Sequence, residues 1–529
     1  MSAAPAAPGD ATLVLPPSRR ILITIGVMSA STLMALDSTI ANVALPSMRG
    51  SLSATTDQIA WVVTGYIIAS AIATPLVAAL SGRLGRKTIF LSSIVAFSVT
   101  SALCGLASSL GELVVFRVLQ GVSGAAFYPL SQAILLDITP RERYGQSMAI
   151  FGLGVMVGPI LGPTLGGFLT EELSWRWVFF INVPFTVGSF VLLALFLPGA
   201  ARDRSRPFDL FGFVLLSLAL GSLQLMLDRG EGQDWFASRE ILLELGIGST
   251  ALFMFLVHML TSPSPYVSPA VFRDRNFANG LIVSAAVGVV LYSGSIVMST
   301  FLQELRGFDV MQAGLLLAPR GLGTAVGMLL VGRLIQRYDP RGILLVGLTI
   351  VAISLVDMAH FTARTDVMPI LFSGVLQGLG LGLVFVPIST IGFATLPPAL
   401  RNEGASLHTL SRSLGGSAGV ALSAAILSAR TEGDFARSLA DVAPLDRDFA
   451  RLAGPLLDLS SPQGLEIVRL MLARNALETA HQATFWFLFA MVLAAVPLLL
   501  LLRRPPRAGV PAPTSAAPAP HPSDAAPEA

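Results

Sequence analysis

Residues 152–169 read GLGVMVGPILGPTLGGFL. The stretch is apolar enough for a membrane interior, yet it holds six glycines and two prolines, the residues that most weaken a helix in water. In lipid, helices associate by close packing, and small residues let two backbones approach each other. Gly154, Gly158, Gly162 and Gly166 recur every four residues and would form one slowly winding groove. The stretch therefore predicts a membrane-spanning helix that receives a partner helix in its groove.

The rest of the 529-residue chain has the composition of a membrane protein. It is 53% hydrophobic and 12% charged, whereas soluble domains carry about a quarter charged residues. Apolar runs of about 20 residues recur along the chain, and each predicts a transmembrane helix. The sequence thus predicts an all-α polytopic membrane protein. We place fourteen spans at residues 21–43, 58–80, 88–108, 113–136, 145–170, 177–198, 209–228, 241–260, 277–300, 312–335, 342–361, 367–395, 403–428 and 483–502.

Arginine residues concentrate in every second loop between these spans. Because positive loops stay on the cytoplasmic side, we expect both termini in the cytoplasm and the chain in the inner (plasma) membrane. The net charge of +2 indicates no affinity for nucleic acid, since the basic residues lie in short loops between spans.

Two segments suggest an internal repeat. SGRLGRK (81–87) follows the second span, and GRLIQRYDPRG (332–342) follows the tenth. Residues 21–198 and 277–503 would then form two related six-helix bundles, with two helices (209–260) inserted between them, as in secondary transporters. Residues 429–482 predict a long, partly helical extracytoplasmic loop, either a connector on the membrane surface or a docking surface. Residues 1–20 and 504–529 predict disordered cytoplasmic ends.

Several motifs in order resemble the fourteen-helix drug:proton antiporter family of the major facilitator superfamily. They are LDSTIANVALP (36–46), the turn at 81–87, RVLQGVSGA (117–125), GPILGPTLGG (158–167), WRWVFFINVPF (175–185), LFSGVLQGLGLGLVFVP (371–387) and SLHTLSRSLGGSAGVAL (406–422). The resemblance implies a proton-driven multidrug efflux protein that exports hydrophobic drugs or toxic compounds by alternating access. It also implies two possible partners, a periplasmic adaptor (membrane fusion protein) and an outer-membrane channel.

The resemblance implies that the glycine-rich stretch lies at the seam between the two bundles and slides or parts during transport. The gating residues would be Gly154, Gly158, Pro159, Gly162, Pro163, Gly166 and Gly167, together with Arg83, Arg86, Lys87 and Asp137 at the cytoplasmic turn. The turn departs from the family pattern, because Gly82 stands where the family has an aspartate and Ala78 where it has a glycine.

Two opposite charges inside spans fall at the same depth. Asp37 lies seventeen residues past Arg20 on an outgoing helix, about 25 Å deep at 1.5 Å per residue. Arg117 lies five residues past Glu112 on an inward-running helix, about 7 Å from the other face. We expect the two side chains to interact. One hypothesis is a proton switch, because burial favours the neutral acid and a nearby arginine favours the carboxylate; the other is a permanent ion pair.

Further polar and aromatic residues inside spans are candidates for a substrate cavity, since intramembrane ionisable groups mark function. They could instead make structural hydrogen bonds or simply pack. The candidates are Arg320, Arg412, His408, Tyr128, Tyr292, Gln120 and Gln377.

The sequence favours an ion gradient as the energy source. There is one cysteine and no G-x-x-x-x-G-K-[ST] motif, so we expect no metal, no cofactor and no ATP site. The alternatives are a dedicated metabolite exporter or importer of the same fold and, from another class, a membrane-embedded enzyme or a sensor. An enzyme would need a cluster of polar groups at one depth, and the intramembrane polar residues are scattered.

Overall fold

A computed structural model describes residues 15–140, 143–199, 208–335, 337–397, 400–442 and 462–502, and these form helices without a β-strand. Of the expected disordered ends, residues 1–14 and 504–529 lie outside the described residues, whereas residues 17–20, also expected to be disordered, form the start of a helix. The long helices are α1 (Pro17–Ser51), α2 (Thr56–Leu84), α3 (Arg86–Leu106), α4 (Leu110–Gly124), α5 (Phe127–Ile138), α6 (Tyr144–Glu172), α8 (Asn182–Phe196), α9 (Leu210–Arg229), α10 (Arg239–Thr261), α12 (Arg275–Thr300), α13 (Val310–Leu334), α14 (Pro340–Met358), α15 (Val367–Ala394), α16 (Arg401–Val442) and α18 (Pro462–Leu501). Short helices are α7 (Trp177–Phe180) and α11 (Ala270–Arg273).

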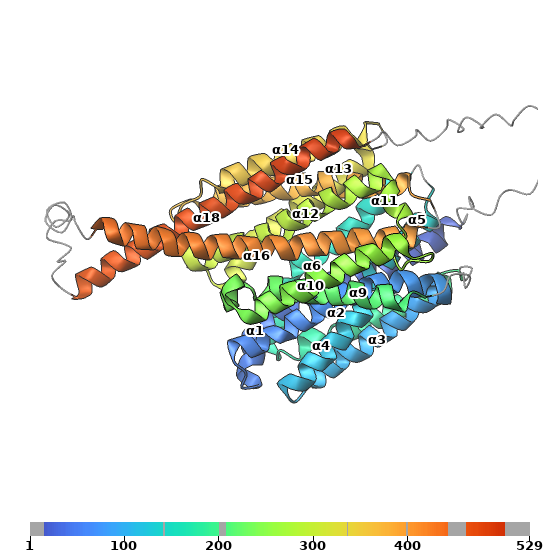
Figure 1. The fold of residues 1–529 in the computed structure, drawn as a ribbon, viewed down its shortest axis with the longest axis horizontal. Coiled ribbons are helices and arrows are strands. Elements are labelled where there is room, and N and C mark those ends of the chain that lie inside the picture. Colours follow the sequence, from blue (N-terminus) through green and yellow to red (C-terminus); the bar gives the residue numbers. More distant parts are fainter. Residues whose placement is uncertain are drawn as a thin grey trace, which may run out of the picture.

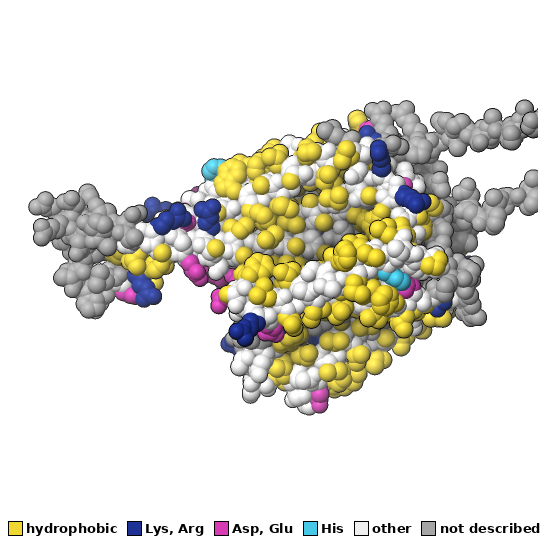
Figure 2. All heavy atoms as spheres, viewed as in Figure 1, with side chains coloured by type: hydrophobic (Ala, Val, Ile, Leu, Met, Phe, Trp, Pro, Cys, Tyr) yellow, Lys and Arg dark blue, Asp and Glu magenta, His cyan; other side chains and the backbone are white. Residues whose placement is uncertain are grey.

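Thirteen helical segments of the described chain are long and apolar enough to cross a membrane. The 29-residue α6 lies between the fourth and the fifth of them, so the long helices follow the order of the fourteen predicted spans. Apolar side chains cover the middle of the molecule, and charged side chains gather toward its two ends (Figure 2). This distribution is that of a multi-pass membrane protein.

The helices form two bundles with an inserted pair. Helices α1–α8 pack mainly on one another, as do α12–α18. In Figure 1, α1 to α4 lie in the lower part, α12 to α15 and α18 lie in the upper part, and α6 and α16 lie between them. The inserted helices α9 and α10 pack together, and α9 also contacts α2 and α16. Gln224 of α9 donates from Nε2 to Ser417 Oγ of α16 over 2.8 Å. The inserted pair therefore bridges the bundles along one side.

The segment predicted as a long loop (429–482) is largely a continuation of two helices. α16 has 42 residues and α18 has 40, about 60 Å each at 1.5 Å per residue against a hydrocarbon core of about 30 Å. Both project beyond the other helices (Figure 1), and Thr479 Oγ1 of α18 donates to Asp434 Oδ2 of α16. The predicted helical content is therefore present, but these described parts project from the molecule rather than lie along its surface.

The two ends of the molecule differ in how their cores are built. We call the end with Arg86 and Arg401 the basic end, and the end where α16 and α18 project the extended end. Toward the basic end one core joins both bundles, with Phe151 of α6 in the same cluster as Met328 of α13 and Phe385 of α15. At the extended end the first bundle has a core of its own, which contains residues such as Met48 and Ile59. The bundles are therefore joined most extensively near the basic end.

The glycine groove of α6 holds helix α1. A Cβ on Gly158 would lie 2.5 Å from Ala35 Cβ and 2.6 Å from the Leu36 nitrogen, so only glycine fits without a shift of the α1 backbone. Gly162 faces Thr39, while Gly166 faces Ile40 and Val43 in the same way. Thr32 Oγ1 donates to the Gly154 carbonyl over 2.7 Å, and Thr39 Oγ1 donates to the Gly158 carbonyl over 3.2 Å. Close approach and hydrogen bonds thus fix α1 against α6.

This arrangement corrects the position expected for the groove. The groove lies inside the first bundle and not at the seam between bundles, because its partner is α1. The helix that carries the stretch does border the second bundle, as expected, but with another face: a Cβ on Gly152 would lie 2.5 Å from Met328 Sδ of α13, and one on Gly145 would lie 2.5 Å from Ile335 Cγ2. Helix α6 is therefore held between α1 and α13. Gly167 faces neither helix, since a Cβ there meets nothing within 4 Å.

We predict that Gly158→Ala lowers the thermal unfolding midpoint of the protein purified in detergent. The added methyl group must displace the α1 backbone, and overpacking of this kind costs about 1–3 kcal/mol. Gly167→Ala is the matched control on the same helix, where the space is open. Equal midpoints for the two variants would show that α1 does not need this close approach.

Candidate functional site

Asp37 and Arg117 form a buried ion pair, as their depths predict. Asp37 comes from α1 and Arg117 from α4, and Arg117 Nη1 lies 2.6 Å from Asp37 Oδ2. Each side chain is only 1% exposed. A charged group in the membrane interior is costly unless it is paired, so each residue requires the other in this conformation.

Two amides complete the coordination of the carboxylate. Gln120 Nε2 donates to Asp37 Oδ1 over 3.1 Å, and Asn182 Nδ2 of α8 donates to the same oxygen over 2.8 Å. Gln120 was expected among the cavity residues, but here it belongs to the ion pair. Asn182 was not among the predicted site residues, although it lies within the quoted motif WRWVFFINVPF, and an amide inside an apolar run was the available signal. Both oxygens of the Asp37 carboxylate therefore accept hydrogen bonds within the protein.

Arg117 is equally well satisfied. Its Nε donates to the Val62 carbonyl over 3.1 Å, and its Nη1 donates to Gln120 Oε1 over 2.8 Å. The guanidinium also lies over the ring of Tyr66, with its central carbon 4.2 Å from the ring centroid, and such cation–π contacts strengthen when desolvated. Loss of the charge on Asp37 would therefore leave Arg117 with several neutral partners.

A second charged cluster joins the bundles at the basic end. Arg86 pairs with Asp137 of α5, and Arg401 of α16 lies 3.7 Å from the other oxygen of Asp137. The Arg401 guanidinium also lies 5.7 Å from the ring centroid of Tyr144 at the start of α6. Among the predicted residues of the turn, Arg86 is the one with a described ion pair to Asp137. Arg401, which was not among the predicted site residues, extends this pairing to the second bundle.

Lys87 and Arg83 of the predicted turn each have a described contact with a neutral group. Lys87 Nζ donates to the Ala194 carbonyl over 2.8 Å, and the Arg83 guanidinium lies 5.9 Å from the ring centroid of Phe208. A Cβ on Gly82 meets nothing within 4 Å. The position that carries an aspartate in the resembling family therefore has space for a side chain in this conformation.

Arg320 and Gln377 lie together inside the second bundle. Arg320 Nη1 donates to Ser295 Oγ over 2.6 Å, and Nη2 donates to the Leu291 carbonyl over 3.1 Å. Both line a cavity of about 10 Å³. Gln377 lies in the sequence VLQG (375–378), which repeats the VLQG at 118–121 that contains Gln120. The repeat places an amide in each bundle, but the second bundle has no described carboxylate paired with Arg320.

Arg412 lies where the bundles meet. Its guanidinium is 5.9 Å from the ring centroid of Tyr128 on α5 and 5.0 Å from that of Phe385 on α15. His408, one turn earlier on α16, packs on Phe393 with ring centroids 5.7 Å apart. Tyr292, by contrast, is 44% exposed. Arg412 and Tyr128 therefore meet across the two bundles, whereas Tyr292 is partly exposed and packs beside Gly416 of α16.

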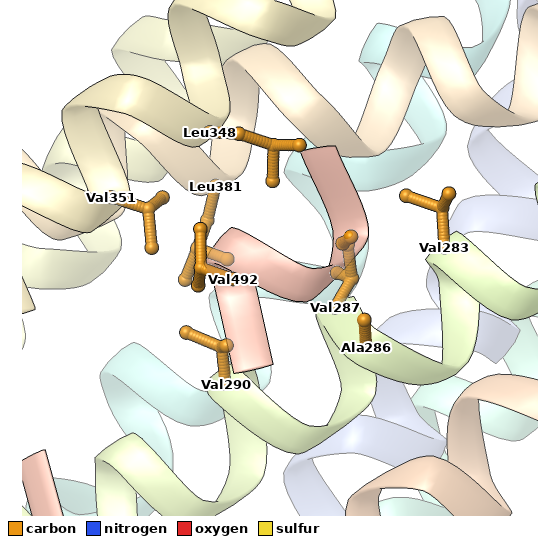
Figure 3. Close-up of a pocket in the computed structure, with 9 residues that line it drawn as sticks. Val283, Ala286, Val287, Val290, Leu348, Val351, Leu381 and Val492 are labelled. Carbon is orange, nitrogen blue, oxygen red and sulfur yellow. The ribbon is translucent and has the colours of Figure 1, made fainter. Parts of the chain in front are cut away.

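Two cavities within the second bundle are far smaller than a drug. The cavity in Figure 3 has a volume of about 10 Å³ and is lined by apolar side chains such as Val283, Val287, Leu348 and Val492. The cavity beside Arg320 is of similar size. Such a volume holds about one water molecule, whereas ligand pockets measure about 300–1,000 Å³. The second bundle is thus closely packed at these two places.

Comparison with known proteins agrees with this architecture. Residues 27–420 match the Major Facilitator Superfamily. The chain is 32% identical over 496 residues to the multidrug export protein EmrB of Escherichia coli (strain K12), covering 92% of this chain and 96% of EmrB. It is 31% identical over 492 residues to the fatty acid resistance protein FarB of Neisseria gonorrhoeae, covering 92% of this chain and 97% of FarB.

A solved structure of the proton:xylose symporter XylE shares the fold, with a TM-score of 0.59 at 14% identity, covering 91% of this chain and 95% of XylE. The predicted fold class is therefore confirmed: two six-helix bundles with two inserted helices, in an all-α membrane protein. Such homologues are transporters. The chain belongs to the major facilitator superfamily and, within it, to the EmrB-like multidrug efflux proteins.

Proposed function

We propose that the protein is a proton-driven exporter that exchanges protons for hydrophobic or amphiphilic compounds by alternating access. The observation that carries this proposal is the buried Asp37–Arg117 pair with both carboxylate oxygens hydrogen-bonded. A buried ion pair often adds little to stability, so stability alone does not explain why two charges lie inside the membrane. An intramembrane acid with defined partners is suited to binding and releasing a proton.

Binding of a proton to Asp37 would weaken the contact between α1 and α4. Protonation removes the negative charge of Asp37 and weakens its bond to Arg117, whose remaining contacts with Gln120, Val62 and Tyr66 are neutral. Because α1 is locked into the groove of α6, and α6 contacts α13, a shift of α1 has a direct path to the second bundle. Packed helices with two arrangements are the physical basis of such coupling.

The conformation also corresponds to one stage of an alternating-access cycle, in which the bundles are in contact near the basic end. The bundles are held together near the basic end by the contacts of Arg401 with Asp137 and Tyr144 and by a shared apolar core. With the basic loops in the cytoplasm, this end faces inward, both termini are cytoplasmic, and the chain lies in the inner membrane. Asp37 then lies toward the outer side, where an exporter driven by the proton gradient takes up protons.

An adaptor and an outer-membrane channel belong to the same proposal. The projecting ends of α16 and α18 would stand on the outer side, and they expose apolar side chains at Leu439, Leu470 and Met471. These apolar side chains would form a contact surface for a periplasmic adaptor. The host's envelope determines whether such a partner exists.

We predict that Asp37→Asn abolishes export driven by a pH gradient in proteoliposomes. The asparagine side chain has the size of the aspartate side chain but cannot bind and release a proton near neutral pH. The substrate is first chosen by drug susceptibilities of an efflux-deficient host, with and without a proton uncoupler. Glu112→Gln is the control, since Glu112 is an exposed acid near the same end. Export by Asp37→Asn at the wild-type rate would remove Asp37 from proton coupling.

We predict that Arg401→Met opens the seam at the basic end. The reporter is a cysteine introduced as Met328→Cys, at a fully buried site on α13. It should react with a thiol reagent about two- to fivefold faster in the Arg401→Met background. This factor follows because a partly exposed ion pair contributes up to about 1 kcal/mol. Arg333→Met, which removes an exposed arginine at this end, is the control. The reaction of Cys104, which is buried, is measured alone and subtracted. An unchanged rate would mean that Arg401 does not hold the seam.

A further inference from the structure

Three side chains at the contact between α5 and α16 are buried with unused hydrogen-bonding atoms. Gln132, His408 and Arg412 are 0%, 2% and 5% exposed. Both amide atoms of Gln132, both ring nitrogens of His408 and Nη1 of Arg412 have no hydrogen-bond partner among the described residues. Buried polar groups are nearly always satisfied, and exceptions require an explanation. Gln132 was not among the predicted site residues. The sequence alone does not show that the helix packed against it lacks a hydrogen-bond partner for its amide.

The register brings these three residues to one place. Tyr128 and Gln132 are one turn apart on α5, and His408 and Arg412 are one turn apart on α16. Helix α5 packs on α16, and the Asp137–Arg401 contact aligns their ends at the basic end. From that contact Gln132 is five residues away and His408 seven, or about 8 and 10 Å at 1.5 Å per residue. Tyr128 is nine residues away and Arg412 eleven, about 14 and 17 Å. The three polar side chains therefore come from two adjacent turns, with Arg412 one turn beyond Gln132 and His408.

The charge at this place is not neutralised by the protein. Arg412 has aromatic contacts with Tyr128 and Phe385 but no carboxylate within ion-pair distance among the described residues. Arg117, on the other side of the first bundle, has Asp37. A buried cation without a counter-ion favours a ligand that brings a negative charge.

We propose that Gln132, His408 and Arg412 bind the carboxylate of an amphiphilic substrate whose apolar part lies along Phe385 and Phe393. This proposal rests on the proposed export function and names its substrate class. A guanidinium matches a carboxylate with two parallel hydrogen bonds, and the Gln132 amide and one His408 ring nitrogen supply further donors. The single unpaired arginine matches a single negative charge, and it repels a cationic drug.

The site is divided between the bundles, which suits alternating access. Gln132 and Tyr128 belong to the first bundle, and His408, Arg412 and Phe385 belong to the second. In the present conformation the two sides are in contact around Arg412. Separation of the bundles would widen the site from both sides and admit the head group, and closure would surround it.

The experiment compares a charged ligand with its neutral counterpart. The probes are 11-(dansylamino)undecanoic acid and its methyl ester, and binding to the purified full-length protein in nanodiscs is followed by dansyl fluorescence without a proton gradient. Wild type should bind the acid at least about tenfold more tightly than the ester, which is the size of a charge-assisted bidentate bond. Arg412→Met should abolish this preference, and Arg412→Lys should keep part of it.

The proposal is overturned if wild type binds acid and ester equally, or if Arg412→Met weakens both to the same extent, which is the mark of a structural role. Should Arg412→Met not fold, Gln132→Leu must still lower the preference for the acid. Arg333→Met is the control that removes an exposed arginine. Asp37→Asn should keep the preference, so failed proton coupling and a failed carboxylate site give different results.

Discussion

The structure depends on the close approach of α1 to α6. Four glycines on α6 remove every side chain from one strip of the helix, and at Gly158 the backbone of α1 occupies the space of a Cβ. Helix α1 carries Asp37, and α6 also contacts α13 of the second bundle. The residue that would exchange a proton and the bundle that must move are thereby joined through two tightly packed helices. Glycines that would weaken a helix in water here permit the contact that organises the membrane protein.

The buried arginines show how the surroundings distinguish roles for the same side chain. Arg117 is paired with a carboxylate and surrounded by amides and an aromatic ring. Arg320 is satisfied by a hydroxyl and by carbonyls of α12. Arg412 has only aromatic faces and an unpartnered Nη1. A structural arginine is satisfied within the protein, whereas an unsatisfied one at a moving interface is free to recognise a ligand.

Much of the fold could be predicted from the sequence because a bilayer fixes the length and polarity of each span. Helix period and depth were also sufficient to predict the contact of Asp37 with Arg117. Periodicity could not show which helix fills a groove, so the partner of Gly158 was misplaced at the seam. It also could not show that α16 and α18 continue as helices beyond the predicted spans. Asn182, Gln132 and Arg401 were missed because their roles depend on residues far away in the chain.

If the protein exchanges protons for substrate at Asp37, substrate binding should displace a proton from this residue, and proton release on binding measures that exchange. The purified protein is placed in a weakly buffered solution with a pH indicator, and the substrate chosen from the susceptibility panel is added. We expect wild type and Glu112→Gln to release protons on binding, while Asp37→Asn binds the substrate and releases none. Equal proton release from Asp37→Asn and wild type would show that another group exchanges the proton.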